Sequence, residues 1–348
     1  MGSYRVFISY SHKDLELVQR VVNALEENGL TPIWDRNFAF GYGFHEQIQT
    51  FISHAHVFMP VITRGSSKRG WVHQEIGYAT ALNIPVLPAT HDALPGEMIQ
   101  RIHALHLSED PAELRQQLSL DVFDNLVNRY REPSFALFQS ADLAEERAMM
   151  MVRYATDVLD LGAFGCVRQK GGLSSFHIPD QVITDPIWKL RYGTGPRSEF
   201  HCRCQRNERI TLEKHARTAG CRLIINPAIS EQFDRTSQLV RLQTLAKFLA
   251  AYPDEKVQVA ITQGMPQQYS LTIVGDWFAA ESASASLTQG YRQTIFTRHA
   301  PSMRSRIDLF ESEFQELLAA SRWDEATSRS SALELIQANI ERLHTMPG

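Results

Sequence analysis

The chain has 348 residues, too many for one compact core, and its 43% hydrophobic and 21% charged residues are typical of a folded two-domain protein rather than a disordered one. A net charge of −4 gives no general attraction to nucleic acids or membranes, and four scattered cysteines exclude a secreted disulfide framework. Since the first residues lack a signal-peptide pattern and no apolar run approaches the roughly 20 residues that span a bilayer, we expect a cytoplasmic location and no membrane partner.

Strands and helices alternate along the first 130 residues. The pattern predicts strands at 4–10, 31–35, 56–63, 84–90 and 103–107, with helices at 11–30, 45–55, 71–83 and 111–129. Such alternation is typical of βαβ units around a parallel sheet. We therefore predict an α/β domain over 1–131, followed by a linker at 132–140.

The loops after the strands of this sheet form the predicted ligand site, because ligands bind at the carboxyl ends of parallel strands. Three segments meet there: 9–14, 35–44 and 64–75. Glu75 lies beside this crevice, near the start of the predicted helix at 71–83. One interpretation is that Glu75 complements the helix dipole, as acids in a first helical turn commonly do. The other is that its carboxylate is held over a pocket for chemistry.

Three segments, in this order, resemble the motifs of TIR domains. "VFISYSHKD" (6–14) resembles the first signature box, and "PIWDRNFAFGYGF" (32–44) resembles the second strand with the variable BB loop. "GWVHQEI" (70–76) resembles the Trp-x-x-x-Glu segment of TIR domains that cleave NAD. The resemblance covers about residues 1–130 and implies a flavodoxin-like parallel-sheet fold. It also implies hydrolysis of the nicotinamide–ribose bond, which releases nicotinamide and ADP-ribose or a cyclic form, with NAD+ as substrate and no cofactor.

The resemblance also assigns site residues. Glu75 would be the catalytic carboxylate, and no metal site is expected. The substrate-binding residues would be Tyr10, Ser11, Asp35, Gly41, Phe44 and Trp71. Two of these have alternative interpretations: Trp71 as a packing residue over the sheet edge, and Phe44 as a hydrophobic staple for the next helix. The loop 37–44 departs from the usual charged, proline-containing BB loop because it is rich in aromatic residues.

A single carboxylate suits this chemistry. Nicotinamide in NAD+ is a cationic leaving group, so its departure needs no general acid and leaves an oxocarbenium-like ribose. Negative charge near that cation and hydrogen bonds to the ribose hydroxyls are then sufficient, whereas glycosidases with poor leaving groups usually need two carboxylates. An aromatic ring such as that of Phe44 or Trp71 could stack on the nicotinamide.

Ser11, His12 and Asp14 do not suggest a nucleophilic triad. Ser11 and His12 are adjacent in the sequence. Asp14 instead fits the N-cap of the helix that follows, where a carboxylate accepts from free backbone N–H groups.

The pattern of residues 141–348 predicts a second α/β domain, and we expect this domain to sense a ligand or to oligomerise. Helices are expected at 140–165, 233–252, 301–320 and 331–344, and strands at 221–228, 256–262, 269–278 and 291–299. A loop-rich stretch is expected between the first helix and about residue 210. The runs "TIVGDWF" and "YRQTIFTRHA" faintly resemble the C-terminal halves of phospholipase-D-like domains. However, His299 is followed by Ala-Pro and does not complete a His-x-Lys motif.

Residues 191–222 combine eight Lys or Arg with three acids. One interpretation is a solvated basic face, and the other is a site for an anionic nucleotide or a nucleic acid. The same segment holds His201, Cys202 and Cys204, but one Cys-x-Cys without a second ligand pair falls short of a zinc signature.

Taken together, the motifs imply a bacterial-type immune effector for antiviral defence, in which the C-terminal domain controls an NAD-cleaving TIR domain. The resemblance to enzymatic TIR domains also implies regulation by assembly, in which neighbouring TIR units complete the site through loop 37–44. An aromatic-rich loop would suit such a partner surface. Two alternatives use the same residues: a non-catalytic TIR adaptor that only mediates protein contacts, and a cyclase that makes a cyclic ADP-ribose signal. Nicotinamide release that depends on Glu75 separates enzyme from adaptor, and the identity of the product separates the cyclase.

Overall fold

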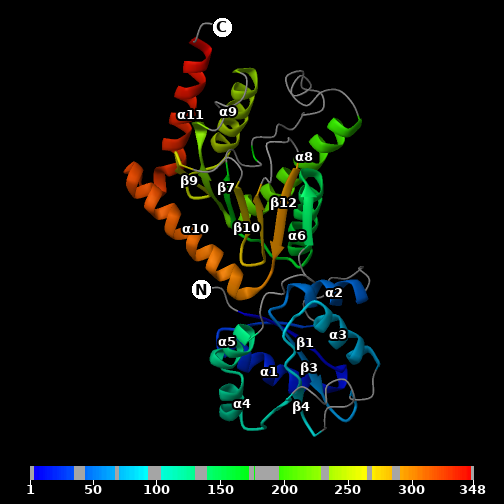
Figure 1. The fold of residues 1–348 in the computed structure, drawn as a ribbon. Helices are drawn as coiled ribbons and strands as arrows, with labels where there is room; N and C mark the ends of the chain where they lie inside the picture. The colour runs from blue at the N-terminus through cyan, green and yellow to red at the C-terminus, as the bar shows by residue number, and fades with distance from the viewer. Residues whose placement is uncertain are drawn as a thin grey trace. The chain divides into compact units, whose positions relative to one another are not determined.

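The computed structural model describes residues 4–34, 44–66, 70–92, 103–129, 139–171, 176, 196–228, 235–264, 269–283 and 291–345. The chain divides into two compact units (Figure 1), the first of Met1–Leu137 with His299–Ser302 and the second of Phe138–Arg298 with Met303–Gly348. The division after Leu137 falls within the segment 132–140 that the sequence predicts as a linker. Within the described ranges, no helix combines the length and the apolar character that a membrane crossing requires.

The first unit alternates strands and helices, as predicted. Its elements are β1 (Arg5–Ser9), η1 (His12–Asp14), α1 (Leu15–Glu27), β2 (Thr31–Ile33), α2 (Phe44–His54), β3 (Val57–Ile62), α3 (Gly70–Ala81), β4 (Ala89–Thr90), β5 (Leu105–His106), α4 (Pro111–Gln117) and α5 (Leu120–Arg129). The prediction of a single helix over 111–129 is wrong, because the segment forms the two helices α4 and α5. The break lies at Ser119, whose carbonyl accepts the N–H of Val122 and so begins the second helix.

The strands of the first unit form one parallel sheet in the order β2-β1-β3-β4-β5. This is the strand order of flavodoxin-like folds, so the predicted fold class is confirmed. The predicted strand at 84–90 is shorter than expected, since only Ala89–Thr90 pairs continuously and Val86 adds an isolated bridge to Phe58.

Both faces of β1 are buried, so successive side chains enter two different cores. Val6 and Ile8 pack into the core shared with α1, α4 and α5. Phe7 points the other way and stacks on Phe51 of α2, with ring centroids 6.0 Å apart. Figure 1 shows α1, α4 and α5 on one side of the sheet and α2 and α3 on the other. Because side chains alternate along a strand, odd-numbered residues of β1 face the side of α2.

The second unit is also α/β, as predicted. Its elements are β6 (Gln139–Leu143), α6 (Ala144–Asp160), β7 (Val167–Gly171), α8 (Pro196–Ala219), β8 (Cys221–Ile225), α9 (Arg235–Ala250), β9 (Val257–Ile261), β10 (Tyr269–Val274), β11 (Phe278–Ala283), β12 (Tyr291–Thr297), α10 (Ala300–Ser321), η6 (Glu325–Thr327) and α11 (Ser328–Thr345). They form a seven-stranded sheet in the order β6-β12-β11-β10-β7-β8-β9. Strands β7, β8 and β9 are parallel, and the others pair antiparallel.

Three sequence predictions for the second unit are wrong. The helix predicted from 140 starts only at Ala144, because the residues before it pair with β12 as β6. The stretch up to about 210, which the sequence predicts to be rich in loops, contains β7 and most of the 24-residue helix α8. The strand predicted at 269–278 ends at Val274, because Gly275 adopts a positive φ of 55° and turns the chain into β11.

Helices cover both faces of this second sheet. On one face, β7, β8 and β9 share a core with α6, α8, α9 and α11. On the opposite face α10 (Figure 1) packs over Ile224, Ile273 and Ala279. Leu223 and Ile225 of β8 enter the first core and Ile224 the second, which is the alternation expected of a buried strand.

Candidate active site

Glu75 of α3 is held by the last residue of β1. Ser9 is buried, with 5% of its surface exposed, and its hydroxyl donates a hydrogen bond of 2.5 Å to Oε2 of Glu75. Ser9 is an odd-numbered residue of β1, so its side chain leaves the strand on the side of α2 and α3. The contact therefore places the Glu75 carboxyl at the carboxyl end of β1, the end of a parallel sheet at which α/β proteins bind ligands.

The helix-dipole interpretation of Glu75 is wrong. Because α3 begins at Gly70, Glu75 is the sixth residue of the helix, and the first turn contains no acid. The favourable effect of a helix dipole falls off within the first turn. A contact with Ser9, rather than the end of its own helix, accounts for the position of this carboxyl.

Burial dominates the electrostatics of Glu75. It raises the pKa of the carboxyl from 4.5 to about 7, and the hydrogen bond from Ser9 acts in the opposite direction. A carboxyl with a pKa near 7 exchanges its proton at neutral pH, and its charged form is poorly solvated. Such a group can transfer a proton, or it can act as a negative charge that attracts a cation more strongly than an exposed carboxylate does.

A side-chain hydrogen bond connects the loop after β1 to the loop after β3. Asp14 occupies the N-cap position of α1, but its side chain does not cap the helix, so that prediction is wrong. The carboxylate instead accepts a hydrogen bond of 3.0 Å from the hydroxyl of Thr63. The backbone N–H of Thr63 donates in turn to Oγ of the buried Ser66, at 2.8 Å. These contacts fix the carboxyl ends of two neighbouring strands to each other.

Tyr10 and Ser11 lie beside Ser9 in the sequence, but the Tyr10 ring uses the opposite side of the sheet. The ring lies 6.4 Å from Trp34 and 6.1 Å from His12, measured between ring centroids, and packs against the core of α1. Ser11 is buried, and its carbonyl accepts the N–H of Asp14. The assigned substrate-binding role of Tyr10 and Ser11 therefore stays a prediction.

The other predicted substrate-binding residues are not described. Asp35 and Gly41 lie outside the described residues. Phe44 begins α2 and Trp71 is the second residue of α3, but their side chains also lie outside the description.

Ser9 is the site residue that the sequence reasoning missed. The signal that could have found it is the period of two in β1. Once Phe7 is assigned to the side of α2, Ser9 is the next side chain on that side and the last before the strand ends. A hydroxyl at that position is well placed to meet a carboxyl on α3.

No metal site emerges in the described part of the chain. It contains no group of three or more His, Cys, Asp or Glu side chains arranged to hold a metal ion. Nδ1 of His201 lies 3.0 Å from a carboxylate oxygen of Glu145, while Cys202 and Cys204 are buried in α8.

The basic segment 191–222 is partly neutralised by acids of the second unit. Arg209 and Arg217 both pair with Glu213, and Arg222 pairs with Glu311 and Glu325. Among the described basic side chains of the segment, Arg203, Lys214 and Arg217 are exposed. A site for an anionic nucleotide or nucleic acid on this segment stays a prediction.

Comparisons with known proteins bear on the first unit. Residues 6–119, from β1 to α4, match the family model of the TIR domain. No curated protein matches the sequence. Among solved structures, the Clostridium botulinum CMP N-glycosidase BcmB matches over 33% of this chain and 97% of its own, with 20% sequence identity and a TM-score of 0.25. A likeness at that score does not bear on the activity of this protein.

Proposed function

Because residues 6–119 form a TIR domain, as their motifs predicted, we propose that this domain cleaves NAD+ at the nicotinamide–ribose bond. The products are nicotinamide and ADP-ribose, or a cyclic form of the latter. Glu75 is the catalytic carboxylate, and Ser9 positions it. The observation that supports the proposal most directly is the half-buried Glu75 carboxyl, held by the Ser9 hydroxyl at the carboxyl end of β1.

The chemistry requires the negative form of Glu75. As nicotinamide departs with the bonding electron pair, positive charge develops on the ribose, and a nearby carboxylate stabilises it. Burial keeps water from screening that attraction. Water then adds to the sugar and loses a proton, which completes the hydrolysis. The Ser9 hydroxyl donates to Glu75 and thereby leaves the other lone pairs of the carboxylate for the ribose hydroxyls.

The substrate itself would favour the reactive form of Glu75. Nearby positive charge lowers the pKa of a carboxyl. Bound NAD+ brings the cationic nicotinamide ring next to Glu75, so the carboxyl loses its proton on binding even at a pH near 7, the pKa that burial gives it. The pH dependence of kcat/KM should therefore show a midpoint near 7, and that of kcat a lower one.

Nicotinamide release from NAD+ by the full-length protein tests the proposal. Glu75→Gln keeps the size of the side chain and an acceptor for Ser9 but removes the charge, so we expect kcat/KM to fall by about 100-fold or more. Glu26→Gln is the matched control, because it removes one charge from an exposed position of α1 and should leave the rate unchanged. Equal release by wild type and Glu75→Gln would reject the catalytic role.

Assembly is the second part of the proposal. TIR units that meet through loop 37–44 would complete each other's sites, and residues 37–43 of that loop lie outside the described residues. Specific activity should then rise with protein concentration, and substitution of the loop aromatics by serine should abolish that rise. A specific activity independent of concentration in an active protein would contradict assembly without contradicting cleavage.

The biological setting we propose is cytoplasmic antiviral defence in bacteria, with the second unit as the sensing or oligomerising part. NAD+ should fall in infected cells that carry the wild-type protein and not in cells that carry Glu75→Gln. The non-catalytic adaptor remains the alternative. It predicts protection that survives Glu75→Gln, whereas a cyclase predicts cyclic ADP-ribose as the product.

A further inference from the structure

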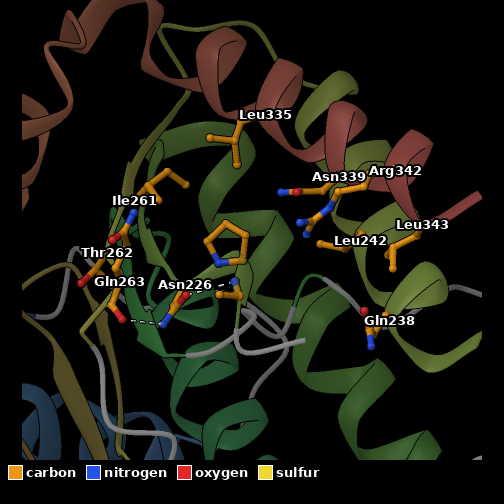
Figure 2. Close-up of a pocket in the computed structure, with 12 residues that line it drawn as sticks. Asn226, Gln238, Leu242, Ile261, Thr262, Gln263, Leu335, Asn339, Arg342 and Leu343 are labelled. Atoms are coloured by element: carbon orange, nitrogen blue, oxygen red, sulfur yellow. Dashed lines mark hydrogen bonds between the residues drawn. The ribbon is translucent and has the colours of Figure 1, made fainter. Parts of the chain in front are cut away.

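The second unit has a pocket at the carboxyl ends of two parallel strands. Figure 2 shows its lining, which comes from the ends of β8 and β9 and from the helices α9 and α11. Its polar side chains are Asn226, Gln238, Thr262, Gln263, Asn339 and Arg342. Leu242, Ile261 and Leu335 are among its apolar ones. The carboxyl end of a parallel sheet is where α/β proteins bind ligands.

Asn226 lines the pocket and connects two of its loops. It directly follows β8 and is buried, with 6% of its surface exposed. Its amide nitrogen donates to the backbone carbonyl of Gln263 at 3.4 Å, and its amide oxygen accepts from the backbone N–H of Ala228 at 3.0 Å. Both bonds are drawn in Figure 2. Asn226 thereby ties the loop after β8 to the loop after β9 and holds the two strand ends in place.

The opposite wall is one face of α11. Leu335, Asn339 and Arg342 are spaced four and three residues apart, so they share one side of the helix. In Figure 2 the side chains of Asn339 and Arg342 extend from α11 toward the middle of the pocket. The neighbouring side of α11 carries Ile336, which lies in the hydrophobic core. The helix is therefore anchored by one stripe and presents a polar stripe to the cavity.

Arg342 gives the described lining of the pocket a positive charge. The described residues that line it include one cation, Arg342, and no Asp or Glu. The amino end of α9 and the carboxyl end of α11 both lie at the pocket, and their partial charges have opposite signs, so the helix dipoles offset each other. A basic residue in the last turn of α11 also complements its dipole, but that role does not require a cavity beneath the side chain.

The size and the donors of the pocket indicate the ligand. Its volume of about 160 Å³ is below the roughly 300 Å³ at which sites for drug-sized molecules begin. A guanidinium has five N–H donors, so Arg342 can keep its other contacts and still donate two parallel bonds to a carboxylate or phosphate. The carboxamides of Gln238, Gln263 and Asn339 offer both donors and acceptors to the rest of the ligand.

We propose that this pocket binds a small organic anion of about one ring in size, with its carboxylate or phosphate on Arg342 and its neutral part among the carboxamides and Ile261. The proposal concerns the second unit alone and does not depend on cleavage of NAD+. Nothing in the TIR motifs or in the basic segment 191–222 assigns a ligand to this place.

Ligand-observed NMR titrations of the full-length protein test the proposal with three probes: benzoate, its neutral isostere benzamide, and inorganic phosphate. Benzoate or phosphate should bind, and whichever binds more tightly identifies the anionic group. Benzamide should bind about tenfold more weakly than benzoate. Arg342→Gln should weaken anion binding by about tenfold or more, whereas Arg203→Gln, an equal loss of charge at an exposed position of α8, should change it less than about twofold.

Leu335→Trp separates the pocket from the surface around Arg342. It keeps every charge and fills the cavity from a position that is 36% exposed, so the fold should tolerate it while benzoate binding is lost. Three outcomes overturn the proposal: no binding of either anion in the millimolar range, equal binding to wild type and Arg342→Gln, or binding that survives Leu335→Trp. The last result would mean an anion on an exposed arginine. Thermal melts of each variant verify that it is folded.

Discussion

Glu75→Gln should stabilise the protein at pH 8 and change it little at pH 5. Folding raises the pKa of Glu75 from 4.5 to about 7, so between these values the folded state binds more protons than the unfolded state and its stability falls as the pH rises. At about 1.4 kcal/mol per pKa unit, ionised Glu75 lowers the free energy of unfolding by about 3 kcal/mol above pH 7. Glutamine escapes this cost because it stays neutral and can still accept from Ser9.

Scanning calorimetry of the full-length protein at the two pH values measures the effect. The stabilisation by Glu75→Gln should be about 2–3 kcal/mol larger at pH 8 than at pH 5, which is about 10 °C in the melting temperature of the affected transition. Glu26→Gln, at an exposed position, should show no such difference. If the effect of Glu75→Gln were the same at both pH values, the carboxyl would not be buried as described, and the electrostatic basis of the proposed function would fail.

Three further predictions follow from contacts described in the two units. Ser9→Ala removes a hydrogen bond that lowers the pKa of Glu75, so the midpoint of kcat/KM for nicotinamide release should move up by about one pH unit; an unchanged midpoint would contradict a positioning role. Glu208→Ala removes the carboxylate whose two oxygens lie 2.7 and 2.8 Å from Nη1 of the buried Arg147. In urea unfolding, the free energy of unfolding should fall by about 3–5 kcal/mol, and a fall below about 1 kcal/mol would be the contrary result. Gly165→Ala places a methyl group 2.6 Å from a backbone nitrogen of the turn between β10 and β11. The free energy of unfolding in the same assay should fall by about 1–3 kcal/mol, and an unchanged value would contradict that close approach.

The first unit could be predicted closely from the sequence because its strands are short, apolar and separated by regular helices. The apolar run 57–62 became β3, buried along its whole length, and the motif containing Glu75 fell on α3. What the sequence did not specify was the partner of Glu75. Ser9 was not singled out, because the first motif contains Tyr10 and Ser11 at the expected site. The period of two places Ser9 on the same side as Phe7, but only the packing of Phe7 on Phe51 shows that this side faces α2.

The second unit was harder to predict because part of its interior is polar. The buried side of α8 includes Glu208 and His215, and a search for apolar periodicity does not count either of them. Glu208 is tolerated there because Arg147 neutralises it. Nδ1 of His215 accepts the N–H of Gly165 and Nε2 donates to the carbonyl of Ala155, and burial lowers the pKa of this neutral ring. These partners lie 50 to 61 residues away, so no local pattern reveals them.

The alternation of β1 between two cores constrains how this chain can vary. Substituting one residue of the strand alters one core, whereas inserting or deleting a residue between Arg5 and Ser9 would exchange the faces of every side chain beyond that point. The Ser9 hydroxyl would then turn toward α1 and away from Glu75. Mutational libraries made of substitutions alone would miss this dependence, because the number of residues before the serine matters more than the identity of any apolar residue among them.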